Sequence, residues 1–148
     1  MLVKPLSEKY LEDLVDVVDE YREFCGFGKR DEATKAFFKR ILENNDAATF
    51  IAINDNDEVM GFVNLYPSYS TLALERIWIL NDLGVSSKFR RLGVANVLID
   101  EAIKFARSTN AIRIELKTGT KNLNAQKLYS KLGFKIDNGN VYYRVPIH

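Results

Sequence analysis

The chain has 148 residues, of which 47% are hydrophobic and 28% are charged, the mix of an ordinary globular protein. Its 21 basic and 20 acidic residues leave a formal net charge of +1, which gives no electrostatic footprint for nucleic acid or for a membrane surface. A small amine or metabolite fits this charge balance better than a polyanion does. No apolar run reaches membrane-spanning length, and we expect a cytoplasmic protein.

The scarcity of cysteine and histidine narrows the chemistry further. Cys25 has no partner for an internal disulfide, and the only histidine, His148, is the last residue. A zinc site of Cys and His ligands is therefore excluded, no metal is expected, and catalytic triads that depend on histidine are nearly excluded. We expect Cys25 to be a buried structural thiol, because no internal histidine is available to activate it.

The first part of the chain predicts a short strand, two helices and three strands. A strand is expected at 3–5, and apolar residues at helical spacing indicate helices from Ser7 to about Tyr21 and over 31–43. Apolar and β-branched runs predict strands over 49–54, 59–66 and 72–85, the first two joined by a turn.

The second part alternates between helices and strands. The expected elements are a turn at 89–95, a helix over 94–108, a strand over 112–117, a helix over 124–132, and a hairpin of strands 134–137 and 141–145. No repeat or linker divides the sequence, so we expect one α/β domain over 1–148 with a mixed sheet, in the order β-α-α-β-β-β-α-β-α-β-β.

The segment Arg90-Arg91-Leu92-Gly93-Val94-Ala95 stands between a strand and a helix. The first amides of a helix have no intrahelical acceptor, and they point outward at the positive end of the helix dipole. Gly93 and Ala95 are small enough for a phosphate to approach these amides, which favours a pyrophosphate site. The alternative is a tight turn with solvated arginines. No Walker or dinucleotide fingerprint is present.

Two motifs resemble the GNAT superfamily of N-acetyltransferases. Arg90-x-x-Gly93-x-Ala95 is similar to its Gln/Arg-x-x-Gly-x-Gly/Ala signature, and the strand through Asp82 looks like the segment before that signature. Asn122-x-x-Ala125-x-x-Leu128-Tyr129-x-x-x-Gly133-Phe134 is similar to a second family segment, in the right order. The resemblance covers nearly the whole chain. Within the superfamily, the chain resembles the branch that contains the fungal histone- and polyamine-acetylating enzymes and their bacterial relatives.

The resemblance implies a mixed, mostly antiparallel sheet flanked by helices, with acetyl-CoA as cosubstrate. Backbone groups on the strand would bind the pantetheine arm, amides of the loop would hold the pyrophosphate, and Asn122 would add a contact unless it only caps its helix. The expected cofactor-binding residues are Leu83, Val85, Arg90, Arg91, Leu92, Gly93, Val94, Ala95, Asn96 and Asn122.

Tyr129 and Asp82 are the expected catalytic residues. Tyr129 matches the general acid of the family, which would protonate the departing thiolate. The alternative is a core tyrosine beside Leu128. Asp82 either takes a proton from the amine, binds a cationic amine, or accepts bonds from backbone amides at a strand bulge. Gly84 stands at a position where the family commonly has a larger residue, so it either widens a pocket or relaxes the strand.

Aromatic and charged residues of two segments are expected to line the acceptor pocket, since rings and carboxylates both stabilise cations. The expected substrate-binding residues are Tyr21, Arg22, Phe24, Tyr66, Tyr69 and Asn81. The predicted reaction is direct acetyl transfer to a primary amine of a small molecule, such as a polyamine or an amino acid. A homodimer is one oligomeric state that we consider. The alternatives are a protein or peptide acetyltransferase and a sensor that binds acetyl-CoA without catalysis.

Overall fold

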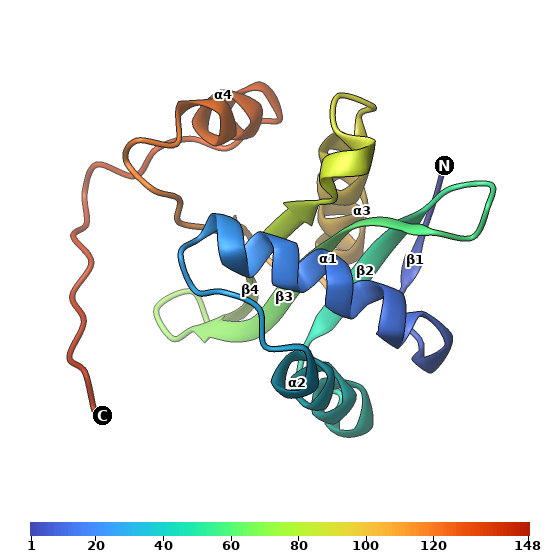
Figure 1. Cartoon of the computed structure of the whole chain (residues 1–148). Helices are drawn as coiled ribbons and strands as arrows, with labels where there is room; N and C mark the ends of the chain where they lie inside the picture. The colour runs from blue at the N-terminus through green and yellow to red at the C-terminus, as the bar shows by residue number, and fades with distance from the viewer. The chain divides into compact units, whose positions relative to one another are not determined.

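A five-stranded sheet with the order β1-β2-β3-β4-β5 organises the first four-fifths of the chain (Figure 1). The computed structural model describes residues 1–148, which form two units, Met1–Lys117 and Thr118–His148. The sheet and three helices belong to the first unit, and one helix belongs to the second. None of the helices is long and apolar enough to cross a bilayer.

The strands pair antiparallel except at one edge. They are β1 (Leu2–Pro5), β2 (Ala48–Ile53), β3 (Val59–Ser70), β4 (Glu75–Val85) and β5 (Ile114–Glu115). β5 runs parallel to β4 and pairs only with Trp78 and Ile79. From Leu80 to Val85, the edge of β4 that faces away from β3 therefore has no strand partner.

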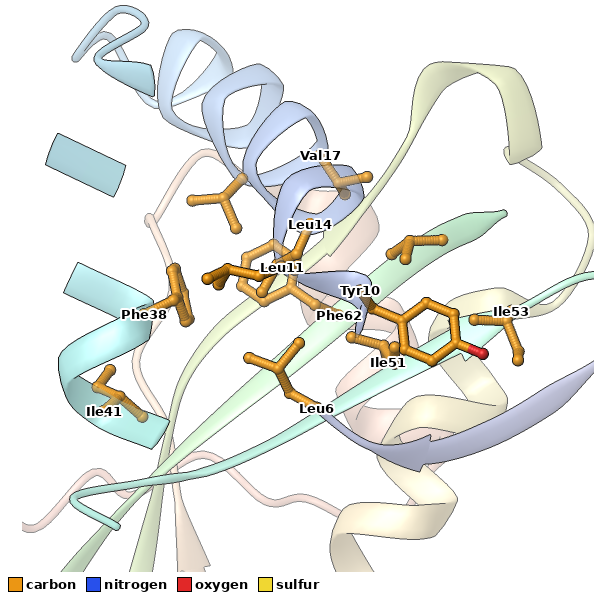
Figure 2. Packing of buried hydrophobic residues seen from close by; sticks show 12 residues of the cluster. Leu6, Tyr10, Leu11, Leu14, Val17, Phe38, Ile41, Ile51, Ile53 and Phe62 are labelled. Carbon is orange, nitrogen blue, oxygen red and sulfur yellow. The ribbon is translucent and has the colours of Figure 1, made fainter. Parts of the chain in front are cut away.

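Helices cover both faces of this sheet. They are α1 (Leu11–Phe24), which follows a short 3-10 turn η1 (Glu8–Tyr10), α2 (Asp31–Asn44) and α3 (Val94–Ser108). Figure 2 shows Leu11, Leu14, Phe38 and Phe62 packed where α1 and α2 meet one face of the sheet. On the other face, the ring of Phe105 of α3 lies 5.3 Å from Phe50 and 4.9 Å from Trp78.

The alternation of side chains along β2 and β3 explains the two cores. Ile51 is paired with Phe62 and Phe50 with Val63, and successive residues of a strand point to opposite faces. Both strands are almost entirely buried along this stretch, as expected for strands with a helix on each side.

The predicted order of elements is confirmed from β1 to α4 (Leu123–Lys131), with shifted boundaries. The strand expected over 72–85 begins at Glu75, because β3 continues through Ser70 and the residues between turn with Leu74 at a φ of 58°. The strand expected over 112–117 pairs only at Ile114–Glu115.

Three other expectations differ from the structure. No strand forms over 134–137 or 141–145, where the apolar alternation is a local signal without a paired backbone. In place of the expected hairpin, the amide of Gly139 donates to Oδ1 of Asp137 at 2.8 Å, a local turn that needs no partner strand. Cys25 is exposed rather than buried, because α1 ends at Phe24 and the chain then turns outward into the loop.

Candidate active site

A pocket of about 370 Å³ opens between α1, α2 and the central strands β3 and β4. Its walls are apolar and aromatic, and its polar groups come mainly from the strands and from the ends of the two helices. The lining residues are Val18, Tyr21, Arg22, Arg30, Ala33, Thr34, Phe37, Phe38, Phe62, Tyr66, Asn81 and Asp82. The size and lining are those of a small-molecule site.

Asp82 supplies the only carboxylate of this lining. Its Oδ1 accepts a hydrogen bond of 3.2 Å from the hydroxyl of Tyr21. Its Oδ2 accepts bonds from the side-chain amides of Asn81 at 3.0 Å and Asn64 at 3.4 Å. All three donors are neutral, and no cation forms an ion pair with Asp82, so no direct contact neutralises its charge.

A bulge in the sheet brings Asn81 and Asp82 into the same pocket. The register of β3 with β4 shifts there, since Asn64 faces Asp82 while Leu65 faces Leu80, so Asn81 is the extra residue. Consecutive residues of a regular strand point to opposite faces, and a bulge re-aims one of them. The bulge expected at Asp82 is thus present, although the partners of the carboxylate are side chains and not backbone amides.

Asn64 was not among the expected site residues, yet it links the polar groups of the pocket. It is fully buried on β3, where its Oδ1 accepts from the hydroxyl of Thr49 at 2.7 Å. Its amide donates to the hydroxyl of Tyr66 at 3.0 Å and to Asp82. A lone asparagine within the apolar run 59–65 was the available signal, because a buried polar side chain needs partners.

The two tyrosine hydroxyls of the pocket hold their protons strongly. Burial first, and then the charge of Asp82, raise the pKa of Tyr21 well above its ordinary value. The same two causes raise the pKa of Tyr66, although the hydrogen bond from Asn64 opposes them. Both hydroxyls are therefore protonated at neutral pH, where Tyr21 donates to Asp82 and Tyr66 accepts from Asn64.

Gly84 allows α1 to lie close to β4. A Cβ on Gly84 would stand 2.7 Å from Cε1 of Phe62 and 3.2 Å from Cβ of Tyr21, both closer than ordinary contacts. The rings of Tyr21 and Phe62 are in edge contact, with centroids 5.6 Å apart. The space left by the missing side chain is therefore filled by these two rings and does not widen the pocket.

Past Val85 the chain enters the loop that was expected to hold a pyrophosphate. A 3-10 turn η2 (Ser87–Phe89) leads into it, and both Arg91 and Gly93 have positive φ, at 63° and 80°. Gly93 precedes α3, no side chain caps that helix, and the space around a Cβ at Gly93 is open. Uncapped amides at a helix start form an anion-binding concavity, so the residues present fit a pyrophosphate.

Glu20 of α1 holds this loop from the side of the helix and was also missed. Its carboxylate accepts from the amide of Ser87 at 2.6 Å and from the Ser87 hydroxyl at 3.0 Å. The guanidinium of Arg90 lies 4.0 Å from the same carboxylate. Since Glu20 and Ser87 are 67 residues apart, no local pattern could have predicted this contact.

The remaining expected residues of the second unit lie in and around α4. Oδ1 of Asn122 accepts from the amide of Ala125 at 3.2 Å, so Asn122 does cap this helix. The ring of Tyr129 packs against Phe134 with centroids 5.7 Å apart. Burial raises the pKa of Tyr129, so its hydroxyl also holds a proton at neutral pH.

Two expected substrate-binding residues do not line the pocket. Phe24 is 71% exposed at the end of α1, and at 100° per residue it lies about 200° around the helix from Arg22. Tyr69 is three residues from Tyr66 on β3 and therefore faces the opposite side of the strand. Its hydroxyl accepts from the guanidinium of Arg76 at 2.7 Å.

Comparison with known proteins gives the same family as the motifs. Residues 14–134 match the model of the acetyltransferase (GNAT) family. The uncharacterized N-acetyltransferase YhfO of Bacillus subtilis is 35% identical over 130 residues, which are 88% of this chain and 87% of that protein. The thialysine N-epsilon-acetyltransferase of Caenorhabditis elegans is 27% identical over 87% of this chain and 79% of its own.

Solved structures agree in fold. The crystal structure of a probable acetyltransferase matches with a TM-score of 0.94 and 36% identity, covering 100% of this chain and 99% of the other. AAC(6')-Iy in complex with the bisubstrate analog CoA-S-monomethyl-acetylneamine matches with a TM-score of 0.82 and 23% identity, over 98% and 97% of the two chains. The chain belongs to the GNAT family of acetyltransferases, enzymes that use acetyl-CoA.

Proposed function

We propose that this enzyme acetylates a primary amine of a small molecule that binds beside Asp82. The observation that carries the proposal is the course of β4. This one strand presents Asp82 to the pocket, continues with an edge that has no strand partner, and leads through η2 to the uncapped start of α3. An acceptor site and a cofactor site are thereby adjacent along one strand.

The free edge of β4 and the loop after it are the proposed acetyl-CoA site. Backbone groups of Leu83 and Val85 would bind the pantetheine arm as an added strand does. Amides from Arg91 to Asn96 would hold the pyrophosphate, with the charge of Arg90 beside them and Asn122 as a further contact. Acetyl-CoA supplies an acetyl thioester, and its transfer to an ammonium substrate yields an amide, a free thiol and one released proton.

Asp82 addresses the protonation of the acceptor. A primary amine with a pKa near 10.4 is neutral in only about one molecule in 2,500 at pH 7. The carboxylate of Asp82, with no cation paired to it, would bind the ammonium form and accept its proton directly or through water. The three neutral donors around Asp82 hold the carboxylate in place for either step.

Tyr129 is the proposed acid for the departing thiolate. Its raised pKa keeps the phenol protonated at neutral pH. A thiol has a pKa near 8.5, which is below that of a tyrosine, so complete transfer is uphill, and the phenol acts by a hydrogen bond that strengthens as charge develops on sulfur. Such general acids typically contribute a rate factor of about 100 or more.

Two similar proteins favour a small acceptor. Thialysine is the named substrate of one relative, and the bisubstrate analog bound to AAC(6')-Iy carries an acetylneamine. The partly aromatic pocket around Asp82, of about 370 Å³, is within the size range of small-molecule sites. Four other expectations stay predictions: the narrower resemblance to histone- and polyamine-acetylating enzymes, the cytoplasmic location, the homodimer, and a single domain over 1–148.

A thiol-release assay tests the proposal. The protein and acetyl-CoA are mixed with polyamines, amino acids, aminoglycosides and lysine peptides, and free thiol is titrated. Release with one or more free small amines, confirmed by the mass of the acetylated product, is the expected result. Binding of acetyl-CoA with no release would favour a sensor, and release with peptides alone would favour a protein acetyltransferase.

A further inference from the structure

The pocket around Asp82 contains charges of both signs. Its single carboxylate is on β4, whereas Arg22 and Arg30 line it from the last turn of α1 and from the start of α2. A site built for a ligand with only positive charges would not be expected to combine one carboxylate with two guanidinium groups.

Arg30 is fixed in position by its backbone. Its amide donates to Oδ2 of Asp19 at 3.1 Å, and its carbonyl accepts from the amide of Thr34 at 2.8 Å. Asp19 is itself 1% exposed and accepts a second bond of 2.6 Å from the Thr34 hydroxyl. These bonds anchor the start of α2 without using the guanidinium of Arg30.

The side-chain charge of Arg30 is not neutralised by the protein. Asp31 and Glu32 follow it in the chain, but neither forms an ion pair with it. Its neighbour Lys29 is paired with Glu23 at 3.7 Å. Arg30 is therefore the cation at this end of the pocket that is available to an anionic group.

Arg22 stabilises the connection between the helices. Its Nε donates to the carbonyl of Gly28 at 3.1 Å and its Nη2 to that of Phe27 at 3.5 Å. Its charge acts on the buried Asp19, so part of it is already balanced within the protein. The positive potential at this end is thus shared, with Arg22 holding the loop and Arg30 free to bind.

We infer that the acceptor is an amino-acid-like zwitterion, whose reacting amine binds Asp82 and whose carboxylate binds Arg30. This inference rests on the proposed function and narrows its substrate class. Rings of Phe38 and Phe62 and the side chain of Val18 lie among the lining and suit a methylene stem between the two charged ends. An α,ω-diamino acid has this arrangement of charges.

The same charges disfavour polyamines. A diamine that placed one ammonium at Asp82 would bring its second ammonium toward Arg22 and Arg30 with no carboxylate beside it to offset the charge, and like charges within one pocket repel. Removing the carboxylate from a good acceptor should therefore lower its kcat/KM, even when the reacting amine and its stem are unchanged.

Matched substrate pairs test the inference. Lysine is compared with cadaverine and ornithine with putrescine, each pair differing only by the carboxylate, with lysinamide as a neutralised analogue. Thiol release is measured with the intact protein at saturating acetyl-CoA. We expect kcat/KM to be about 10- to 100-fold higher for the carboxylate member of at least one pair, the range of a charge-assisted hydrogen bond.

Two variants test whether Arg30 causes the preference for the carboxylate member of a pair. Arg30→Gln should lower kcat/KM for the preferred amino acid by a similar factor through KM, and it should reduce the ratio within the pair toward one. Lys29→Gln removes the adjacent charge, which lies outside this pocket, and should keep the ratio. Circular dichroism confirms that both variants are folded.

Each outcome decides the inference. Equal or higher kcat/KM for the decarboxylated members would overturn it and leave the acetyltransferase function supported. A ratio unchanged by Arg30→Gln would also overturn it. Absence of thiol release from all five compounds would overturn the inference, whereas release from other amines of the wider panel would still support the proposed function.

Discussion

The hydroxyl of Tyr21 donates a hydrogen bond of 3.2 Å to Oδ1 of Asp82, which joins α1 to β4 at the pocket. The contact depends on Gly84, two residues further along the strand, because the ring of Tyr21 occupies the space of a side chain there. One tyrosine thus orients the carboxylate of the pocket and forms part of its wall.

Stability should decline in alkaline solution, partly because of Tyr21. Its raised pKa keeps it protonated in the folded chain, while in the unfolded chain a tyrosine ionises near pH 10. Above about pH 10 the unfolded chain therefore binds fewer protons, and the free energy of unfolding falls as the pH rises. Tyr21→Phe should reduce this dependence by at most about one proton, measured by urea unfolding between pH 9 and 11. Tyr143→Phe changes an exposed tyrosine and should leave the dependence intact.

Asp82→Asn should weaken binding of the amine acceptor. The substitution keeps the shape of the side chain and removes the only carboxylate of the pocket. We expect KM for the amine to rise about 10- to 100-fold, the loss of a charge-assisted hydrogen bond. Steady-state kinetics measure it, with Asp55→Asn in an exposed turn as the control. A fall in kcat of about 100-fold at constant KM would instead identify Asp82 as the base.

Tyr129→Phe should act on the chemical step. Loss of the hydroxyl should lower kcat by about 10- to 1,000-fold, while the dissociation constant of acetyl-CoA changes little. Single-turnover kinetics and calorimetry measure the two quantities separately. An unchanged single-turnover rate is incompatible with a general acid at this position.

Arg90→Ala should weaken binding of acetyl-CoA in a salt-dependent way. The side chain is exposed beside the loop that contains Gly93, so its attraction for a pyrophosphate is screened by salt. Calorimetry should show a dissociation constant raised about tenfold at low salt, with a smaller difference at about 0.5 M salt. Arg107→Ala, at the exposed far end of α3, is the control for charge alone. Equal affinities for the wild type and Arg90→Ala at low salt would remove Arg90 from the cofactor site.

Gly84→Ala should destabilise the fold and disturb the pocket together. The new Cβ would stand 2.7 Å from Phe62, so the ring or the strand must shift, at a cost of about 1 to 3 kcal/mol. Denaturant unfolding measures the change, and Gly119→Ala is a suitable control because no atom lies within 4 Å of its added Cβ. Wild-type stability in Gly84→Ala would show that α1 is not held as closely as described.

The loop at Gly93 and the helix after it were predicted from the sequence because their signal is local. Arg90, Gly93 and Ala95 lie within one turn between a strand and a helix, and the helix was expected over 94–108, where the structure has it. A positive φ at Gly93 and an uncapped helix start follow from residues that are neighbours in the chain. The same reason explains why capping could be named from the sequence as the alternative role of Asn122, and the structure has this cap.

The pocket around Asp82 could be recognised only from the tertiary structure. Tyr21, Arg22, Tyr66, Asn81 and Asp82 were all expected at the site, but only the packing of α1 and α2 on the sheet brings them into one pocket. Asn64 and Glu20 have hydrogen-bond partners far away in the sequence. Arg30 lines the pocket, and whether its charge is paired depends on how the chain packs.

The sequence by itself determined the family, the order of elements through α4 and the loop at Gly93, since all three depend on local spacing. Only the tertiary structure decided which side chains surround Asp82, because the bulge at Asn81 and the close approach of α1 at Gly84 arise from contacts between distant segments. It also showed that the alternating apolar residues after Phe134 form no strands, since a strand exists only where another backbone pairs with it.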